Sequence, residues 1–258
     1  MWGAICGDVI GSVYEGSPVK KEDFDLFPTG SRFTDDSVLT VAVADAILND
    51  ENYAKKLKEY GRMYPNAGYG GNFMRWIFSP SYAPYGSFGN GSAMRVSPVG
   101  FAYDNIKKVN EEAHKTAAVT HDHPEGIKGA RATAVAVCMA RKDHEKAEIK
   151  EYIEIEFGYD LDRKIEDIRP NYTFDVSCQG SVPESIICFL ESADYEDAVR
   201  KAISLGGDSD TMACIAGSIA HPYYKEIPDY ILNPVKSSLD EKLLQLIEKF
   251  NSRYRIYY

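Results

Sequence analysis

Two carboxylates, a serine and a threonine stand together in the stretch LGGDSDTMACIAGSIAH, which covers residues 205–221. Asp208, Asp210 and Thr211 follow a double glycine and precede a run of small apolar residues that is typical of a buried helix. One Asp, Ser or Thr is enough to cap the start of a helix. Two carboxylates this close repel each other unless a cation or hydrogen-bond donors compensate them. The stretch therefore predicts either a helix cap or a set of oxygen ligands for a metal ion.

A second cluster of the same kind lies far upstream, in RFTDDSVLTVAVADAILND. Thr34, Asp35 and Asp36 precede apolar residues with a helical period, so this cluster also stands at the start of a helix. Hard cations such as Mg²⁺, Mn²⁺ and Ca²⁺ prefer oxygen ligands, and neither cluster contains the His or Cys typical of zinc sites. If these residues served only as helix caps, the same surplus of Asp and Thr at two separate helix starts would be a coincidence. We therefore favour a two-metal site built from both clusters. Capping and ligation are compatible, since a carboxylate near a helix start also gains from the helix dipole.

A glycine-rich stretch, PYGSFGNGSAMRVSPVG, occupies residues 84–100. Gly86, Gly89 and Gly91 allow close backbone approach, so successive N–H groups around Asn90 can point at one anion, and a helix beginning near Ser92 would add its dipole. The stretch is neither a Walker A loop nor a GxGxxG loop after a strand, so it gives little support to a nucleoside triphosphate or Rossmann site. From these residues alone, a phosphate cradle and an ordinary glycine-rich turn both remain open.

Three ring side chains near these stretches could contact a ligand. Phe88, flanked by small residues, could stack on a base, although an isolated aromatic residue in a loop more often packs against the core. His121 and His123, in VTHDHPEG, precede a helix and are most often capping or surface residues in such a position. A ligand contact is the less frequent alternative for each histidine.

Apolar spacing, punctuated by Gly, Pro, Asn and Asp, predicts an almost entirely helical chain. Strand signals are few: residues 171–177 alternate weakly, and the tail RYRIYY at 253–258 could form a short edge strand. Residues 157–182 are polar and irregular enough for a surface connection. The expected helices cover residues 3–13, 36–49, 52–62, 70–78, 92–102, 106–119, 124–141, 144–156, 183–192, 195–204, 210–220 and 238–252.

The whole chain has the size and composition of one globular domain. Its 258 residues contain no Gly/Ser or Pro-rich linker, so a single domain over 1–258 is expected, in which distant helix starts can meet.

A net charge of -10 and a pI near 5.1 disfavour a general nucleic-acid or anionic-membrane surface. No apolar stretch reaches the ~20 residues of a membrane span and no signal peptide is apparent, so we expect a soluble, cytoplasmic protein. Five scattered cysteines indicate small buried side chains in a reducing compartment.

Taken together, these stretches resemble the ADP-ribosylglycohydrolase family, metal-dependent hydrolases that remove ADP-ribose from modified targets. Five segments in the family's order cover most of the chain, and the poorest match lies between about 142 and 176. The segments are GAICGDVIGSVYEG at 3–16, FTDDSVL at 33–39, GSFGNGSAMRVSPVG at 86–100, THDHPEG at 120–126 and the stretch from VPESIICFL to GSIAH at 182–221.

The resemblance implies an all-α, compact single-domain fold with a dinuclear metal cleft and two Mg²⁺ or Mn²⁺ ions as cofactors. It also implies that Glu15 is an acidic residue on a segment beside the metals. The ions would bind hydroxyls of the distal ribose and polarise a water near its anomeric carbon, with Glu15 or a metal-bound Asp as the base and carboxylates stabilising oxocarbenium-like charge. The implied metal ligands are Thr34, Asp35, Asp36, Asp208, Asp210 and Thr211, and the implied catalytic residues are Glu15, Asp35, Asp36 and Asp208.

The resemblance further assigns the glycine-rich loop to the pyrophosphate, with Phe88 beside the adenosine and His121 near the phosphates. The implied substrate-binding residues are Gly86, Ser87, Phe88, Gly89, Asn90, Gly91 and His121. At the position of Ser87, the family's bacterial branch that acts on arginine-linked ADP-ribose has Asp, whereas branches that act on serine-linked or polymeric ADP-ribose have Ser. Ser87 therefore weighs against an arginine linkage without selecting among the others.

The expected partner is an ADP-ribosylated protein, nucleic acid or small molecule, with ADP-ribose as product and a monomeric enzyme. Two alternatives stay open. The chain could be an inactive ADP-ribose-binding or structural member of the fold, although all six implied ligand positions and Glu15 are retained. It could instead be a two-metal hydrolase of the pyrophosphate itself, which would release AMP rather than intact ADP-ribose.

Overall fold

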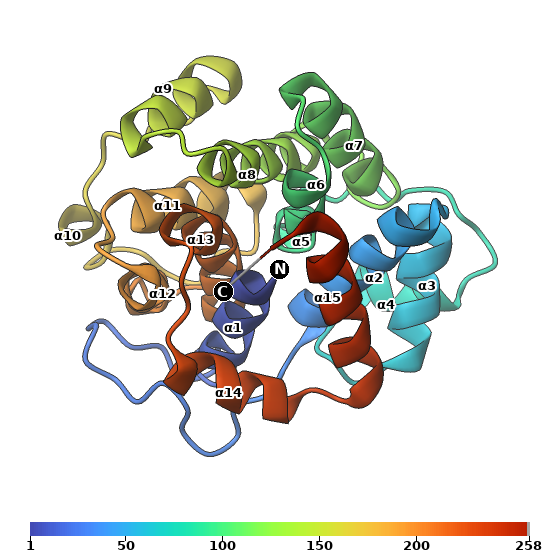
Figure 1. The fold of residues 1–258 in the computed structure, drawn as a ribbon, viewed down its shortest axis with the longest axis horizontal. Coiled ribbons are helices and arrows are strands. Elements are labelled where there is room, and N and C mark those ends of the chain that lie inside the picture. Colours follow the sequence, from blue (N-terminus) through green and yellow to red (C-terminus); the bar gives the residue numbers. More distant parts are fainter. Residues whose placement is uncertain (257–258) are drawn as a thin grey trace.

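A computed structural model describes residues 1–256 of the protein, and its regular elements over that range are helices, with one isolated β-bridge (Figure 1). The expected all-α fold is therefore confirmed. The helices are α1 (Trp2–Gly11), α2 (Asp35–Asn49), α3 (Tyr53–Met63), α4 (Gly71–Phe78), α5 (Gly91–Met94), α6 (Ser97–Ala102), α7 (Ile106–Ala118), α8 (Pro124–Arg141), α9 (Lys146–Phe157), α10 (Ile165–Ile168), α11 (Cys178–Leu190), α12 (Tyr195–Ser204), α13 (Ser209–Tyr224), α14 (Asp229–Ser238) and α15 (Glu241–Tyr254).

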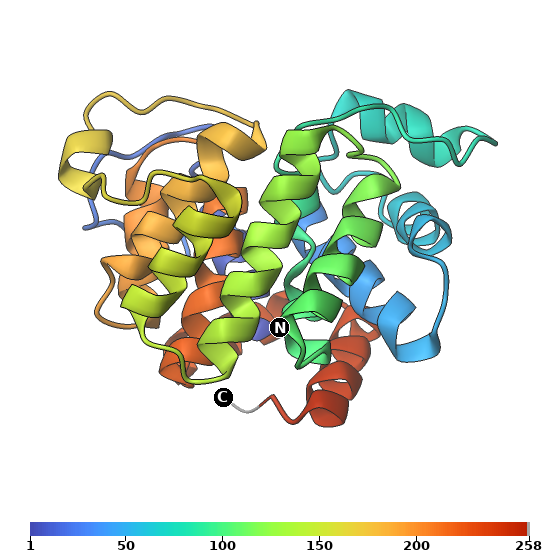
Figure 2. The same ribbon diagram turned by 90° about the horizontal axis from the view of Figure 1, so that it is seen from above.

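Helices α1 and α13 form the centre of the molecule, and the other helices surround them (Figure 1). All ten residues of α1 are buried, which agrees with the apolar character of this helix on every side. Figure 2 shows α8 crossing the molecule between α9 and α7, and α8 packs against both. The buried apolar side chains of residues 1–256 join into one core cluster.

A stripe of glycines at helical spacing brings α1 against α13. A Cβ atom at Gly3, Gly7 or Gly11 would lie only 2.2, 2.1 or 2.5 Å from backbone atoms of α13. Only glycine permits this approach, because any side chain would push the two helices apart. The small residues of α13 thus serve contact with α1, its most extensive partner. The start of α13 is fixed beside the middle of α1.

The helix ends follow the side chains that cap them. Thr34 is the N-cap of α2, and its Oγ1 accepts the Asp36 N–H at 3.3 Å. His123 is the N-cap of α8 and accepts the Glu125 N–H at 3.1 Å, so the capping interpretation of this histidine is confirmed.

The five cysteines are free and buried, as expected.

The expected helix over 92–102 is interrupted, because α5 ends at Met94 and α6 begins at Ser97. Pro98 has no N–H to donate to the Met94 carbonyl, and its ring would clash with that carbonyl in a continuous helix. The Met94 carbonyl is instead used by other helices: it accepts the Thr40 hydroxyl and the Cys214 thiol, each at 3.3 Å.

The expected boundaries after residue 157 differ most. The surface connection contains the short helix α10, and α11 begins at Cys178 rather than at 183 because Ser177 caps it. Pro183 lies inside that helix. Helix α14 was not predicted.

The two weak strand signals do not form strands within residues 1–256. In the stretch 171–177 only Ser177 pairs, through an isolated bridge to Gly89. In the tail, residues 253–254 belong to α15, and residues 257–258 lie outside the described part. No helix among the described residues is both long and apolar enough to cross a membrane.

Candidate functional site

The start of α2 is held in place by Asp8, a buried residue of α1. One Asp8 oxygen accepts the Thr34 hydroxyl at 2.7 Å. The other accepts the backbone N–H groups of Thr34 and Ser37 at 2.9 and 3.0 Å, and also the Ser37 hydroxyl. Four donors at one helix start thus share one carboxylate, which acts as a cap supplied by another helix. Asp8 thereby fixes the position of the first acidic cluster relative to α1.

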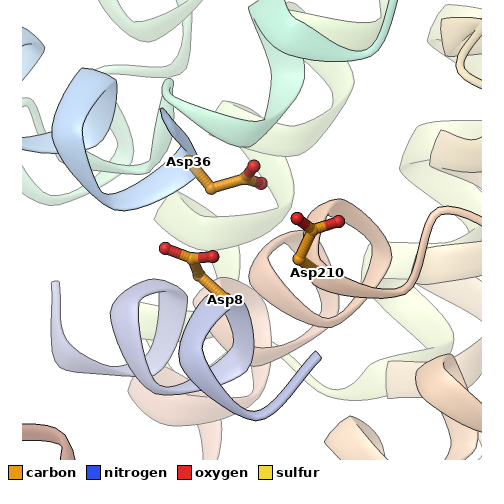
Figure 3. Close-up of side chains that lie close together, drawn as sticks. All are labelled: Asp8, Asp36 and Asp210. Carbon is orange, nitrogen blue, oxygen red and sulfur yellow. The ribbon is translucent and has the colours of Figure 1, made fainter. Parts of the chain in front are cut away.

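The two acidic clusters converge at this point. Carboxylate oxygens of Asp8, Asp36 and Asp210 lie within 4.8 Å of one another, and Figure 3 shows the three side chains directed toward a common space from α1, α2 and α13. The Thr211 hydroxyl of α13 donates to an Asp36 oxygen at 3.3 Å, which links the two helix starts directly. Residues 175 positions apart in the chain therefore share one site.

Burial and mutual repulsion make this cluster costly without a cation. Burial, and then the charge of Asp210, raise the pKa of Asp8 to about 7. The same two causes raise the pKa values of Asp35, Asp36 and Asp208 well above the ordinary range. Within residues 1–256, no Lys or Arg side chain forms an ion pair with these carboxylates. Protonation of the carboxyl groups or a bound cation can relieve this repulsion.

The donor set fits a hard divalent cation. Asp36 Oδ1 is buried and has no hydrogen-bond partner among the described residues, whereas both oxygens of Asp8 already accept hydrogen bonds. Carboxylate and hydroxyl oxygens are the ligands that Mg²⁺, Mn²⁺ and Ca²⁺ prefer. Asp8 thus has the contacts of a supporting residue, and Asp36 those of a ligand. The clusters contain no Cys or His ligand, so zinc is a poorer match.

A cavity of about 380 Å³ opens above the acidic cluster, a size typical of small-molecule sites. Predicted residues from five segments line it: Glu15, Thr34, Asp35, Asp36, Ser87, Gly89, Asn90, Gly91, His121, Asp208, Asp210 and Thr211. Gly86 and Phe88 belong to the same loop but do not line the cavity. The structure thus brings most of the predicted site residues together.

Asn90 joins the glycine-rich loop to the acidic cluster. Its side-chain amide donates to an Asp208 oxygen at 2.8 Å, and its backbone N–H donates to the Val176 carbonyl at 2.7 Å. The first contact ties the loop to the start of α13, and the second ties it to the segment just before α11. Asp208 is thereby oriented by a neutral partner that adds no positive charge beside it.

The loop offers fewer free amides than a full phosphate cradle requires. The N–H groups of Gly86, Ser87, Gly89 and Asn90 donate to Asp122, the Thr120 carbonyl, Ser87 Oγ and Val176 respectively. Phe88 and Gly91 are the loop residues whose N–H groups form no such bond in the described structure. An anion here would rely on those two amides together with side-chain donors.

The rings near the loop have different environments. Phe88 is 48% exposed and contacts the edge of the His123 ring, so it is not a core residue. His121 is buried, and burial, followed by the charge of Arg95, lowers its pKa well below the usual value.

Glu15 is an exposed residue at the cavity. Partial desolvation, followed by the charge of Asp210, raises the pKa of its carboxyl group.

The sequence interpretation missed Asp8 and the buried Arg95, which lines the cavity. Asp8 could have been found as the single charged residue in the apolar stretch GAICGDVIG. For Arg95, the surrounding residues SAMRVSPV give only the weaker signal of a charge in a mostly apolar segment.

The fold and the site define a helical protein with a small-molecule cleft. Beneath the cleft lies a buried cluster of carboxylates whose oxygens suit a divalent cation. The sequence model of the ADP-ribosylglycohydrolase family matches residues 1–256. The chain therefore belongs to the ADP-ribosylglycohydrolase family, a class of hydrolases.

Individual relatives agree with this assignment. ADP-ribosylhydrolase ARH3 of Bos taurus is 27% identical, in a comparison that covers 88% of this chain and 85% of that protein. Human ADP-ribosylhydrolase ARH3 is 26% identical, with 86% and 83% covered. An uncharacterised protein of Archaeoglobus fulgidus is 28% identical, with 95% and 94% covered.

A solved structure described as an ADP-ribosylglycohydrolase-related protein complex has the same fold. It superimposes with a TM-score of 0.74 at 23% identity, and the comparison covers 99% of this chain and 95% of that one.

Proposed function

We propose that this protein is a divalent-metal-dependent hydrolase that cleaves the glycosidic bond at the anomeric carbon of the distal ribose of ADP-ribose. The reaction would release ADP-ribose from a modified protein, nucleic acid or small molecule. The observation that carries the proposal is the convergence of two buried Asp/Thr helix starts on one cleft, where Asp36 Oδ1 has no partner within the described chain. Membership of the ADP-ribosylglycohydrolase family supports it.

Two Mg²⁺ or Mn²⁺ ions are the proposed cofactors, and the residues that would hold them are Thr34, Asp35, Asp36, Asp208, Asp210 and Thr211. When bound, such ions supply Lewis acidity toward ribose hydroxyls and a water molecule. The chain's contribution is to hold six oxygen-bearing side chains on two helix starts that Asp8 and the α1–α13 contact fix in position.

Glu15 is the proposed base, because its carboxylate lies at the cavity and its pKa is raised by desolvation and by Asp210. A raised pKa makes a carboxylate a stronger proton acceptor at neutral pH. Asp35, Asp36 and Asp208 would stabilise the positive charge that develops on the ribose as the leaving group departs. Asn90 would keep Asp208 oriented for that task.

The diphosphate would lie against the loop formed by Ser87, Gly89, Asn90 and Gly91, with His121 beside it. The amides of Phe88 and Gly91 are the available backbone donors. The exposed ring of Phe88 would contact the adenosine at the cleft edge.

Ser87 bears on the bond that is cleaved. An arginine-linked substrate presents a cationic guanidinium, which an acidic residue at this position would stabilise, and Ser87 supplies no such charge. We therefore propose that at least one other linkage is cleaved in preference to arginine-linked ADP-ribose.

A panel of defined substrates tests this function: serine-linked, arginine-linked, polymeric and nucleobase-linked ADP-ribose and O-acetyl-ADP-ribose. Each is assayed with Mg²⁺, with Mn²⁺ and with a chelator, and products are identified by mass. Intact ADP-ribose released only with a divalent ion is the expected result. AMP as product, or full activity in chelator, would overturn the proposal.

Matched variants connect that activity to the site. Asp208→Asn should abolish turnover, whereas Asp162→Asn removes the same charge from an exposed carboxylate elsewhere and should retain wild-type activity. Equal loss in both variants would point to a general effect of charge instead.

A further inference from the structure

Arg95 is a buried cation without an anionic partner. Its side chain is fully buried between α5 and α6, and it forms no ion pair with a carboxylate of residues 1–256. Nη2 donates to the Thr116 carbonyl at 2.9 Å and to the Thr120 hydroxyl at 2.8 Å. Nε and Nη1 have no hydrogen-bond partner in this part of the chain. Burying a charged guanidinium without hydrogen bonds to two of its nitrogens costs folding free energy, so its presence requires an explanation.

The contact with Thr120 offers such an explanation, because it reduces the number of hydrogen bonds that the Thr120 hydroxyl can accept from a neighbouring ring. Arginine carries only donors, so Thr120 Oγ1 accepts from Arg95. Thr120 Oγ1 also lies 2.8 Å from His121 Nδ1. Arg95 takes one lone pair of Thr120 Oγ1, which leaves the hydroxyl its proton and one further lone pair for the contact with Nδ1. When the hydroxyl proton points at Nδ1, Nδ1 accepts and the single proton of the neutral imidazole resides on Nε2.

The other ring nitrogen faces the glycine-rich loop. A Cβ atom at Gly91 or Gly89 would lie 3.3 or 3.6 Å from His121 Nε2, so both glycines leave space around this atom. His121 also lines the cavity. Since four amides of the loop already donate within the protein, an Nε2–H group adds a donor where few are free.

We propose that Arg95 and Thr120 are positioning residues that hold His121 as its Nε2–H tautomer, a neutral hydrogen-bond donor aimed at the diphosphate of the ligand. The ligand's identity rests on the function proposed above, whereas the tautomer is a property of the free protein. Burial and the nearby Arg95 lower the pKa of His121, which keeps the ring neutral at pH 7. A neutral ring has one proton, so its location decides whether the cavity meets a donor or an acceptor.

The tautomer is tested by ¹H–¹⁵N spectroscopy of the imidazole nitrogens in the metal-free, ligand-free protein. The chain has five histidines, and the His121 signals are assigned by their absence from His121→Asn. Wild-type protein and Thr120→Ser should show a protonated Nε2 and an unprotonated Nδ1, because both retain the hydroxyl. Thr120→Val and Arg95→Met should show a mixture of tautomers. A protonated Nδ1 in wild-type protein, or an unchanged tautomer in Thr120→Val, would overturn the proposal.

Binding of ADP-ribose tests the consequence. Thr120→Val should weaken binding about twofold for an even mixture of tautomers, because only the fraction with a proton on Nε2 keeps the donor, and Thr120→Ser should restore it. Thr133→Val is the matched control: the Thr133 hydroxyl is buried and has no hydrogen-bond partner within residues 1–256, so this variant should leave affinity unchanged. Equal affinities of Thr120→Val and wild-type protein would contradict the role of the relay in binding.

The two measurements separate two kinds of failure. Wild-type protein with the expected tautomer but no affinity for ADP-ribose would refute the proposed function and leave the Arg95–Thr120–His121 relay standing. Affinity for ADP-ribose with the opposite tautomer would refute the relay alone. If Arg95→Met does not fold, the two Thr120 variants decide the question.

Discussion

The Asp8 carboxylate lies 3.0 Å from the backbone nitrogen of Ser37, so a residue of α1 caps the first turn of α2. This bond and the three others that Asp8 accepts connect the central helix to the first acidic cluster. The geometry of the proposed metal site therefore depends on a residue whose own oxygens are already occupied.

Replacing Asp8 with Asn should destabilise the protein and weaken metal binding. An amide cannot accept four hydrogen bonds, so buried donors of Thr34 and Ser37 would lose their acceptor, at a cost of about 2–3 kcal/mol. Loss of a residue that orients ligands commonly lowers metal affinity by about 10- to 100-fold. Thermal unfolding and Mn²⁺ titration measure the two effects. Asp36→Asn should lose metal affinity while metal-free stability stays the same or rises, and similar losses of metal-free stability in both variants would contradict the distinction.

Gly7→Ala should disrupt the α1–α13 contact. The new Cβ would lie 2.1 Å from the Ala213 carbonyl oxygen, so the helices must separate, and we expect a loss of roughly 2 kcal/mol or more in the free energy of unfolding. Separation would also move Asp210 away from Asp36, so affinity for Mn²⁺ should fall. Gly16→Ala, where the added Cβ meets no atom within 4 Å, is the control for stability. Unchanged unfolding of Gly7→Ala would show that the close approach is unimportant.

Fold and site differ in how far the sequence predicts them. Helical periods and caps such as Thr34 are local, so the all-α fold and most helix positions follow from spacing. The convergence of Asp36 and Asp210 follows from the glycine stripe of α1 packing on α13, which no spacing between the clusters encodes. The matching oxygen-ligand chemistry of the two clusters indicated that pairing, and the family resemblance supported it.

Other features depend on tertiary contacts that the sequence does not show. The role of Asp8 requires knowing that α1 passes the start of α2, and the loop amides are occupied by Asp122 and Val176 from distant segments. Helix α14 escaped prediction because Pro234 interrupts its apolar pattern.

The metal-free protein should lose stability as the pH rises from about 4 to about 7. The pKa of Asp8 is raised to about 7 in the folded protein, and the pKa values of Asp36 and Asp208 are also raised, by burial and by Asp210. Because the folded state binds more protons than the unfolded state in this range, unfolding becomes easier as these groups ionise. Denaturant unfolding in chelator at several pH values measures the effect.

A divalent ion should reverse that trend, so stabilisation by Mg²⁺ should increase between pH 5 and pH 7.5. Asp36→Asn removes one ionising group and should show both a shallower pH dependence and less stabilisation by Mg²⁺. A metal-free protein that gains stability from pH 5 to pH 7 by the same amount in wild type and variant would contradict the electrostatic account.

The central claim, that α2 and α13 together hold divalent ions, is tested most directly by anomalous diffraction from crystals grown with Mn²⁺. The account predicts Mn²⁺ peaks within coordination distance of the Asp36 and Asp210 carboxylates. A second acidic group, Glu154, Asp160 and Asp162, provides an internal comparison that is mostly exposed. Peaks only at that group, or none beside Asp36 and Asp210, would contradict the account.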